Sequence, residues 1–190
     1  EVLRSQGLAR TSELERGGVS RTQLARLVQR GEIERVGRGL YRLPGAGYDE
    51  RQSLAEAARR VPAGVVCLLS ALRFHGLTTQ NPFEVWMAVP HKAWRPTFGY
   101  PPLRLVFLSP PMFEADVEKH RAGGTSIQVF SAPRTVVDCF KFRNKLGTDV
   151  AVQALREYHR KHPKRLAALE RVAGFGRVDR VMRPYLESLE

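Results

Sequence analysis

The fold of this chain is decided by residues 11–43, TSELERGGVSRTQLARLVQRGEIERVGRGLYRL. The first part, residues 11–16, has a short helical pattern, and residues 17–19, Gly-Gly-Val, are typical of a tight turn. Residues 20–30 predict a second helix, because their apolar side chains recur at helical spacing. Two short helices joined by a glycine turn are therefore expected here.

Both ends of the second helix carry end signals. Ser20 and Gln23 have the S-x-x-Q spacing of a capping box, in which each side chain satisfies a free backbone N–H at the start of a helix. Gly31 is the residue type that commonly closes a helix. We therefore expect the helix to begin at Ser20 and to end before Gly31.

A basic β-ribbon is predicted after this helix, with Gly37 and Gly39 flanking Arg38 at its tip. The ribbon and the helices each offer apolar side chains for a small shared core, and we predict a winged helix-turn-helix over residues 1–46. The apolar positions of the ribbon are Ile33, Val36, Leu40, Tyr41 and Leu43, and those of the helices are Leu3, Leu8, Leu14, Leu24, Leu27 and Val28.

The polar face of the second helix has the side chains expected of a DNA reader. In a helix-turn-helix the second helix enters the major groove, where Arg recognises guanine, Gln recognises adenine, and Thr offers a hydroxyl and a methyl group. The predicted base-reading residues are Arg21, Thr22, Gln23 and Arg26, and Gln29 is predicted to lie on the same DNA-binding face. Arginines of the ribbon are expected to hold DNA phosphates or a minor groove, namely Arg35, Arg38 and Arg42. Winged-helix units also serve as protein-docking modules, and that alternative stays open.

The charge of the chain is concentrated in two zones. Its 190 residues carry a net charge of +12, of which residues 1–43 contribute +4 and residues 141–165 contribute +6. A surplus of this size favours polyanionic partners. The second zone is interpreted as a solvated face, as extra contact to the DNA backbone, or as a docking surface for RNA or an acidic partner. The secondary basic patch comprises Lys141, Arg143, Lys145, Arg156, Arg160 and Lys161.

A second, larger domain of mixed helices and strands is predicted over residues 47–190. The stretch Leu-Pro-Gly-Ala-Gly at 43–47 breaks the preceding pattern and marks the boundary. Strands interleave with helices without a regular βαβ repeat, which favours an α+β fold. Helices are expected at about 50–61, 65–75, 134–145, 150–161, 166–172 and 178–189, and strands at 83–89, 103–108 and 126–130.

The sequence offers no established catalytic motif. Its five histidines lack the spacing of a metal site, and neither a P-loop nor a nucleophile elbow is present. We interpret His75 as a cap or core residue, and Arg134 and Asp138 as a structural pair on one helix face. Trp86 and Trp94 are interpreted as core and lid residues, although either ring could stack on a base. We expect no enzymatic activity, no metal and no cofactor.

The remaining composition indicates a cytoplasmic protein. The two cysteines, Cys67 and Cys139, lie far apart in apolar surroundings, and we interpret them as buried free thiols in a reducing compartment. The sequence contains neither a signal peptide nor an apolar run approaching the roughly 20 residues that span a bilayer. No membrane association is expected.

The chain resembles the AbiEi family of antitoxins from bacterial abortive-infection, or type IV, toxin–antitoxin systems. The resemblance rests on an ordered set of segments across most of the chain. These are GVSRTQLARLV at 18–28, GEIERVGRGLYR at 31–42, LSALRFHGL at 69–77, FEVW at 83–86, and PRTVVDCFKFR at 133–143 followed by Gly147.

The resemblance implies a transcriptional repressor that binds inverted repeats of double-stranded DNA in its own promoter, through an N-terminal winged helix. It also implies a C-terminal domain needed for antitoxicity and a nucleotidyltransferase-like toxin that is countered without a stable complex. A monomer or weak dimer, with two copies on the DNA, is the expected assembly. Since this N-terminal module is also found fused to nuclease-type domains, a winged-helix nuclease is the alternative enzymatic interpretation.

Overall fold

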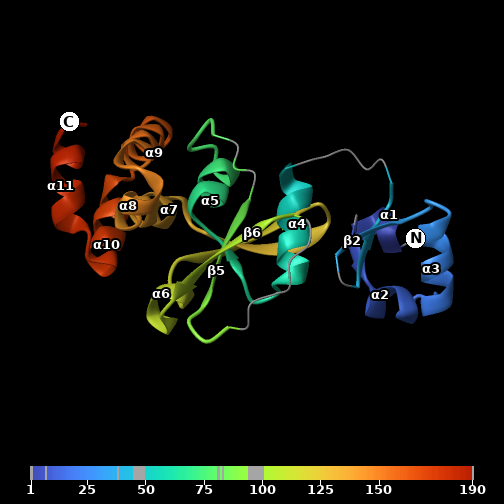
Figure 1. The fold of residues 1–190 in the computed structure, drawn as a ribbon. Helices are drawn as coiled ribbons and strands as arrows, with labels where there is room; N and C mark the ends of the chain where they lie inside the picture. Colours follow the sequence, from blue (N-terminus) through green and yellow to red (C-terminus); the bar gives the residue numbers. More distant parts are fainter. Residues whose placement is uncertain are drawn as a thin grey trace.

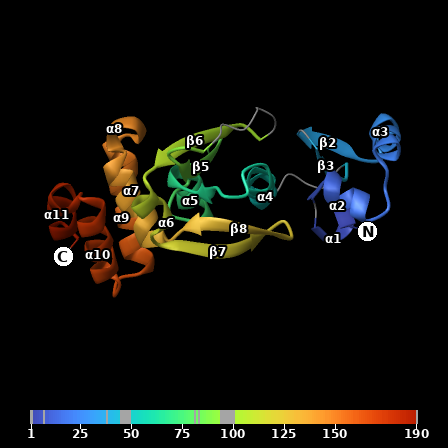
Figure 2. The ribbon, with the colours of Figure 1, turned by 90° about the horizontal axis from the view of Figure 1, so that it is seen from below.

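The computed structural model describes residues 2–6, 8–37, 39–44, 50–80, 82, 84–93 and 101–189. The N-terminal helices and a small sheet lie at one end of the molecule, a larger sheet lies in the middle, and the last helices lie at the opposite end (Figure 1, Figure 2). Helices and strands are mixed along the chain, so the predicted α+β class is confirmed. None of the helices in these described stretches is long and apolar enough to cross a lipid bilayer.

The N-terminal part contains three helices and three strands. The two helices and two strands expected in residues 11–43 are all present, and a third strand, β1, joins them. The three strands form an antiparallel sheet in the order β1-β3-β2. Their bounds are α1 Val2–Gln6, β1 Leu8–Arg10, α2 Thr11–Arg16, α3 Arg21–Gln29, β2 Glu34–Gly37 and β3 Leu40–Arg42.

This part has a hydrophobic core of its own. Five apolar side chains are buried in it, and Leu27 and Val28 pack against them. The core positions predicted on the helices are confirmed for Leu3, Leu14, Leu24, Leu27 and Val28. Leu8 was predicted on a helix but lies on β1, and its side chain is outside the described residues. On the ribbon, the side chains of Val36 and Leu40 also lie outside them. The buried residues are Leu3, Ala9, Leu14, Leu24 and Ile33.

The larger sheet has five strands in the order β6-β5-β4-β8-β7. The three strands predicted in this region are confirmed, with small shifts of their ends. The pairs β5–β6 and β4–β8 are parallel, whereas β4–β5 and β7–β8 are antiparallel. The strands are β4 Val65–Val66, β5 Val85–Pro90, β6 Leu103–Leu108, β7 Val117–Ala122 and β8 Thr125–Phe130.

The prediction of a helix over residues 65–75 is wrong for its first turn. Val65 and Val66 form the central strand β4, and helix α5 (Leu68–Phe74) begins only after Cys67 as its N-cap. Both valines are buried between the neighbouring strands. Because β-branched side chains pack well on a pleated surface, tertiary packing overrides the helical pattern here.

Strand β7 was not predicted, because its sequence VEKHRA is largely polar. It lies at an edge of the sheet, where one face is open to solvent and polar side chains are acceptable. Gly123 and Gly124 join it to β8 and both have positive φ, 51° and 74°, as a two-residue hairpin turn requires. The Gly-Gly pair was therefore the available sequence signal for this hairpin.

Two hydrophobic clusters cover opposite faces of the larger sheet. On β5, Val85, Met87 and Val89 face the helix α4, while Trp86 and Ala88 face the cluster that contains α7, α9 and α10. This alternation is the period of two expected of a strand that is buried on both faces. The helices are α4 Glu50–Arg60, α6 Pro110–Glu114, α7 Ala132–Lys141, α8 Arg143–Leu146, α9 Thr148–Lys161, α10 Leu166–Gly176 and α11 Asp179–Glu187.

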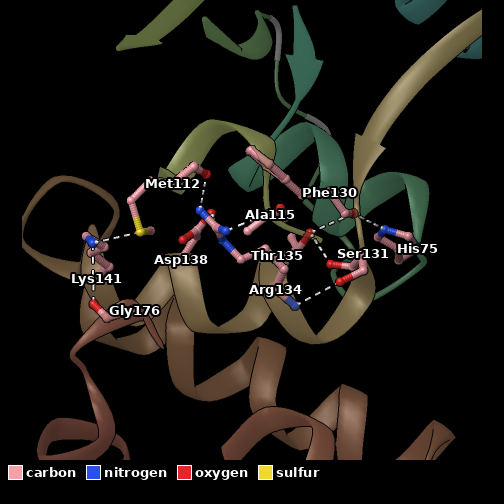
Figure 3. A network of polar contacts seen from close by, with 10 residues as sticks. All are labelled: His75, Met112, Ala115, Phe130, Ser131, Arg134, Thr135, Asp138, Lys141 and Gly176. Carbon is pink, nitrogen blue, oxygen red and sulfur yellow. Dashed lines mark hydrogen bonds and ion pairs between the residues drawn. The ribbon is translucent and has the colours of Figure 1, made fainter. Parts of the chain in front are cut away.

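A buried arginine joins α6 to α7 (Figure 3). Arg134 is 1% exposed, and its Nε donates to Oδ2 of Asp138 at 2.9 Å, which confirms the predicted pair. Its two terminal nitrogens donate to the carbonyl oxygens of Ala115, at 3.4 Å, and Met112, at 2.9 Å. The guanidinium also lies 4.7 Å from the centre of the Phe130 ring. This one side chain therefore fixes α6 against the start of α7.

The carboxyl group of Asp138 has a raised pKa in spite of its ion pair with Arg134. Burial raises the pKa of Asp138 to about 6, although the charge of Arg134 and the hydrogen bond from it act in the opposite direction. Because this pKa exceeds the ordinary value of 3.8, the folded protein takes up a proton as the pH falls from about 7 to 4. The stability that Asp138 contributes thus rises on acidification.

We predict that Arg134→Met lowers the free energy of unfolding by about 3–5 kcal/mol at pH 7.5, because it leaves a buried carboxylate without its countercharge. The loss should be smaller at pH 5. Without Arg134 the pKa of Asp138 rises further, so the variant gains more stability from protonation than the wild type does. Urea denaturation at the two pH values measures both effects.

The double variant Arg134→Met/Asp138→Asn is the matched control, because it has no carboxylate to protonate. Its deficit relative to the wild type should not shrink on acidification. A cost below about 1 kcal/mol for Arg134→Met, or an equal cost at both pH values, would contradict the structural role of the pair.

Candidate nucleic-acid interface

The turn between α2 and α3 is fixed by backbone hydrogen bonds and a capping box. Gly18 has a φ of +88°, and the N–H of Val19 donates to the carbonyl oxygen of Leu14 at 3.0 Å, which closes α2. Ser20 Oγ then accepts from the N–H of Gln23 at 3.3 Å, and Gln23 Oε1 accepts from the N–H of Ser20 at 2.8 Å. The predicted capping box is therefore confirmed, and it sets where α3 begins.

The outer face of α3 carries the predicted base-reading residues. Leu24 is only 2% exposed and anchors the inner face, so the helical period turns the polar residues outward. In both views α3 lies on the side of the N-terminal part that faces away from the larger sheet (Figure 1, Figure 2). The exposed residues are Arg21, Thr22, Gln23, Arg26 and Gln29.

Two of these residues already have partners. The Nε of Arg21 donates to Oε1 of Glu15 in α2 at 2.8 Å, although the side chain of Arg21 remains 81% exposed. The side-chain oxygen of Gln23 is held by the capping box, which leaves its NH₂ group to meet a ligand. Within the described part of the chain, no hydrogen bond or ion pair is found for the side chains of Thr22, Arg26 and Gln29.

The ribbon arginines have different surroundings. Arg35 is exposed on β2, and Arg38 lies outside the described residues. Arg42 is only 20% exposed: its Nε donates to Oε2 of Glu34 at 2.7 Å, and Nη1 lies 3.5 Å from Oε1 of Glu56. The expected phosphate contact of Arg42 thus competes with two carboxylates, and we assign this residue a structural role.

The contact between Arg42 and Glu56 is part of a polar junction between the N-terminal part and α4. Glu56 has no exposed surface, and burial raises the pKa of its carboxyl group above the ordinary value, although Arg42 and Arg60 oppose the shift. Sequence reasoning missed this junction, because its two sides are distant along the chain and Glu56 lies within an ordinary charged helix pattern.

Arg59 forms the second half of the junction. Its Nη1 donates to both carboxylate oxygens of Glu13, at 2.6 and 2.9 Å, and its Nε donates to Oγ1 of Thr125 at 3.1 Å. Burial alone would raise the pKa of Glu13, but hydrogen bonds from the N–H of Arg10 and from Arg59 hold it below its ordinary value. The junction therefore ties α2 to α4 and to the β7–β8 hairpin.

The secondary basic patch is largely engaged in contacts within the protein. Four of its six residues donate hydrogen bonds: Lys141 to the carbonyl of Gly176, Arg143 to that of Phe140, Arg160 to Glu157, and Lys161 to the carbonyls of His75 and Gly76. Lys145 lies 5.8 Å from the centre of the Phe142 ring, and Arg156 is exposed on α9. These cations mainly close helix ends and join helices.

His75 and Trp86, which were candidates for a catalytic or base-stacking role, make contacts within the protein. His75 Nε2 lies 2.8 Å from the carbonyl oxygen of Phe130, and burial lowers the pKa of this histidine. Trp86 is 7% exposed and belongs to the core, as predicted, whereas Trp94 lies outside the described residues. In the described stretches, no group of three His, Cys, Asp or Glu side chains is placed to hold a metal ion.

Both cysteines are free and buried, as predicted. Burial raises the pKa of the Cys67 thiol and of the Cys139 thiol well above the ordinary range. A raised pKa disfavours the thiolate form, on which the reactivity of a cysteine depends.

In a comparison with known protein families, a match is found that ends before α4. Residues 1–44 match the model of a family described as a transcriptional regulator, AbiEi antitoxin. This match confirms the resemblance for the N-terminal part and supports a role in transcriptional regulation. A comparison with curated proteins finds no match.

We predict that Arg42→Met lowers the free energy of unfolding by about 1–3 kcal/mol, because a charge-assisted hydrogen bond is lost and Glu56 stays buried. Adding Glu56→Gln should restore part of this loss, since the amide carries no charge. Thermal unfolding of the two variants measures the effect. DNA affinity of Arg42→Met should match that of the wild type, and a selective loss of affinity without a loss of stability would instead favour the phosphate contact expected from the sequence.

Proposed function

We propose that the chain is a transcriptional repressor and antitoxin that binds double-stranded DNA through a winged helix-turn-helix formed by residues 1–46. The observation that carries the proposal is the arginine-bearing outer face of α3, which is exposed on a helix whose opposite face is anchored in a core. The family match at residues 1–44 supports the same function. Residues 47–190 form the second domain in this proposal.

In the proposed complex α3 enters the major groove with its first turns toward the base edges. Thr22, Arg26 and Gln29 offer side chains without competing contacts in the described stretches, and Gln23 offers its NH₂ group. Each well-placed bidentate contact to a base contributes about 1–3 kcal/mol of discrimination. Arg21 would exchange its exposed ion pair with Glu15 for DNA, and such exposed pairs contribute little.

The ribbon supplies contacts that do not depend on sequence. Arg35, exposed on β2, and Arg38, expected at the ribbon tip from the sequence, are proposed to hold phosphates. Contacts of this kind release counterions, so they make affinity depend steeply on salt. Arg42 is left out of this set because of its contacts to Glu34 and Glu56.

The antitoxin role is proposed from the family alone. By resemblance, two copies bind the inverted repeats of the promoter, and the second domain counters a nucleotidyltransferase-like toxin without a stable complex. A test is co-expression of the chain with the product of the adjacent reading frame, with growth as the readout. Rescue of growth by the full chain supports the role. Absence of rescue by a chain that still binds the promoter would restrict the protein to transcriptional regulation.

We predict that Arg26→Ala weakens binding to the DNA upstream of its own reading frame by about tenfold or more, and weakens binding to a scrambled duplex much less. Arg35→Ala should weaken binding to both duplexes about equally, and should reduce the slope of log affinity against log salt by about 1. Fluorescence anisotropy with labelled duplexes at several salt concentrations measures these quantities.

Arg183→Ala is the matched control, because it removes an exposed arginine from α11, outside both basic zones of the sequence. It should bind both duplexes as the wild type does. Equal losses on the two duplexes for Arg26→Ala would remove this residue from the base-reading set. Failure of the wild type to bind either duplex, with capture of a stable protein complex, would instead favour a docking module.

A further inference from the structure

A cavity at the opposite end of the molecule from α3 has features of a ligand site. It has a volume of about 370 Å³, which lies within the range of small-molecule pockets. Three segments form its walls: the start of α6, the end of α7 and the end of α10. The lining residues are Ser109, Pro111, Met112, Lys141, Phe175 and Arg177.

The walls of this cavity are held in place by a buried arginine and by a lysine at its rim. Arg134 binds the carbonyl oxygens of Met112 and Ala115 and so fixes α6 on α7 (Figure 3). Lys141 in turn joins α7 to α10, because its Nζ donates to the carbonyl oxygen of Gly176 at 3.3 Å. Because these contacts already hold the walls in place, the protein loses little conformational entropy when a ligand binds.

Among the residues that the structure describes, two cations and no carboxylate line the cavity. The second ammonium contact of Lys141 is to the sulfur of Met112 at 3.8 Å (Figure 3), and sulfur is a weak acceptor that an anionic oxygen would replace. Arg177 is exposed at the other wall. A phosphate carries close to two negative charges and three acceptor oxygens at neutral pH, so it matches this pair of donors.

Phe175 adds a flat apolar surface beside these cations. At 46% exposure, it is the one exposed large hydrophobic residue found in the described part of the chain. A ring in this position gives a base a face on which to stack. The carboxylate of an acidic peptide would pair with one of the two cations and would leave the ring of Phe175 exposed. A nucleoside phosphate therefore matches the cavity better.

Arg177 has a backbone conformation that its side chain does not favour. Its φ and ψ are 57° and 40°, the left-handed conformation that usually belongs to glycine at the end of a helix. Glycine would close α10 at lower cost, yet the position holds an arginine that is one of the residues lining the cavity. Unfavourable backbone conformations of this kind concentrate at binding sites.

We propose that this cavity binds a nucleoside phosphate, with its phosphate between Lys141 and Arg177 and its base on Phe175. The ligand is either a free mononucleotide or the terminal nucleotide of a single strand, which share this chemistry. The site lies outside the residues proposed for operator binding and does not depend on them.

Isothermal titration calorimetry of the full chain with adenosine 5′-monophosphate tests the proposal. We expect saturable 1:1 binding that Arg177→Gly weakens at least tenfold, the loss typical of a charge-assisted hydrogen bond. This variant should unfold at nearly the same temperature as the wild type. Relief of the left-handed backbone offsets the greater freedom of glycine in the unfolded chain. Phe175→Leu should weaken the binding of the nucleotide about tenfold but leave the binding of ribose 5-phosphate unchanged.

Arg180→Ala is the matched control, because it removes an equal exposed charge from α11, outside the cavity lining. Wild-type affinity in this variant supports a built site. Equal losses in Arg180→Ala and Arg177→Gly would assign binding to the general positive charge and overturn the proposal, as would the absence of saturable binding up to about 1 mM.

A single-stranded tetranucleotide with a terminal phosphate distinguishes the two sources of the ligand. Tighter binding than the mononucleotide, lost in Arg177→Gly, assigns the site to a strand end, whereas equal binding assigns it to the free nucleotide. Retention of both ligands by Arg177→Gly would overturn the proposal. Operator affinity should be unchanged in this variant, so the result is separate from the test of the repressor.

Discussion

The attachment of α3 to the small N-terminal core is the constraint on which the proposed function depends. Leu24 is buried, and Leu27 and Val28 pack beside it, so three positions at helical spacing fix which side of the helix faces inward. The capping box of Ser20 and Gln23 fixes where the helix begins. Once its inner face and its first residue are set, the helix has one way to present Arg26. The outward orientation of the polar face of α3 therefore follows from the packing of its apolar face.

Local signals accounted for this part of the fold. The capping box, the glycine turn and the apolar spacing each act within a few residues, so they are readable from the sequence. Strands that depend on neighbours were not readable in the same way. Val65 and Val66 continue a helical pattern, and only the adjacent β5 and β8 make them a strand. The polar strand β7 is stable because it lies at the edge of a sheet and is closed by a Gly-Gly turn.

For the arginines too, contacts within one helix could be predicted from the sequence, whereas contacts between distant parts of the chain could not. Arg134 and Asp138 are four residues apart on a helix, so their pairing was predictable from spacing. The pairing of Arg42 with Glu56 joins two parts of the chain that no local pattern connects. The sequence predicts a phosphate contact for Arg42 from its place on the ribbon, and it leaves Lys141 in a basic patch that is either a solvated face or a binding surface. Tertiary contacts assign Arg42 to the junction with α4 and place Lys141 at the cavity beside Phe175.

Among the described residues, positive charge thus lies in four kinds of place: exposed on α3 and β2, at the junction with α4, buried beside α6, and at helix ends near the C-terminus. The claim that the first of these meets DNA is tested most directly by backbone amide NMR of the full chain during titration with the duplex from its own promoter region. The account predicts that the amides of α3 and β2 shift first and most, while those of α9–α11 stay in place. Shifts confined to the C-terminal helices, with α3 unchanged, would contradict it.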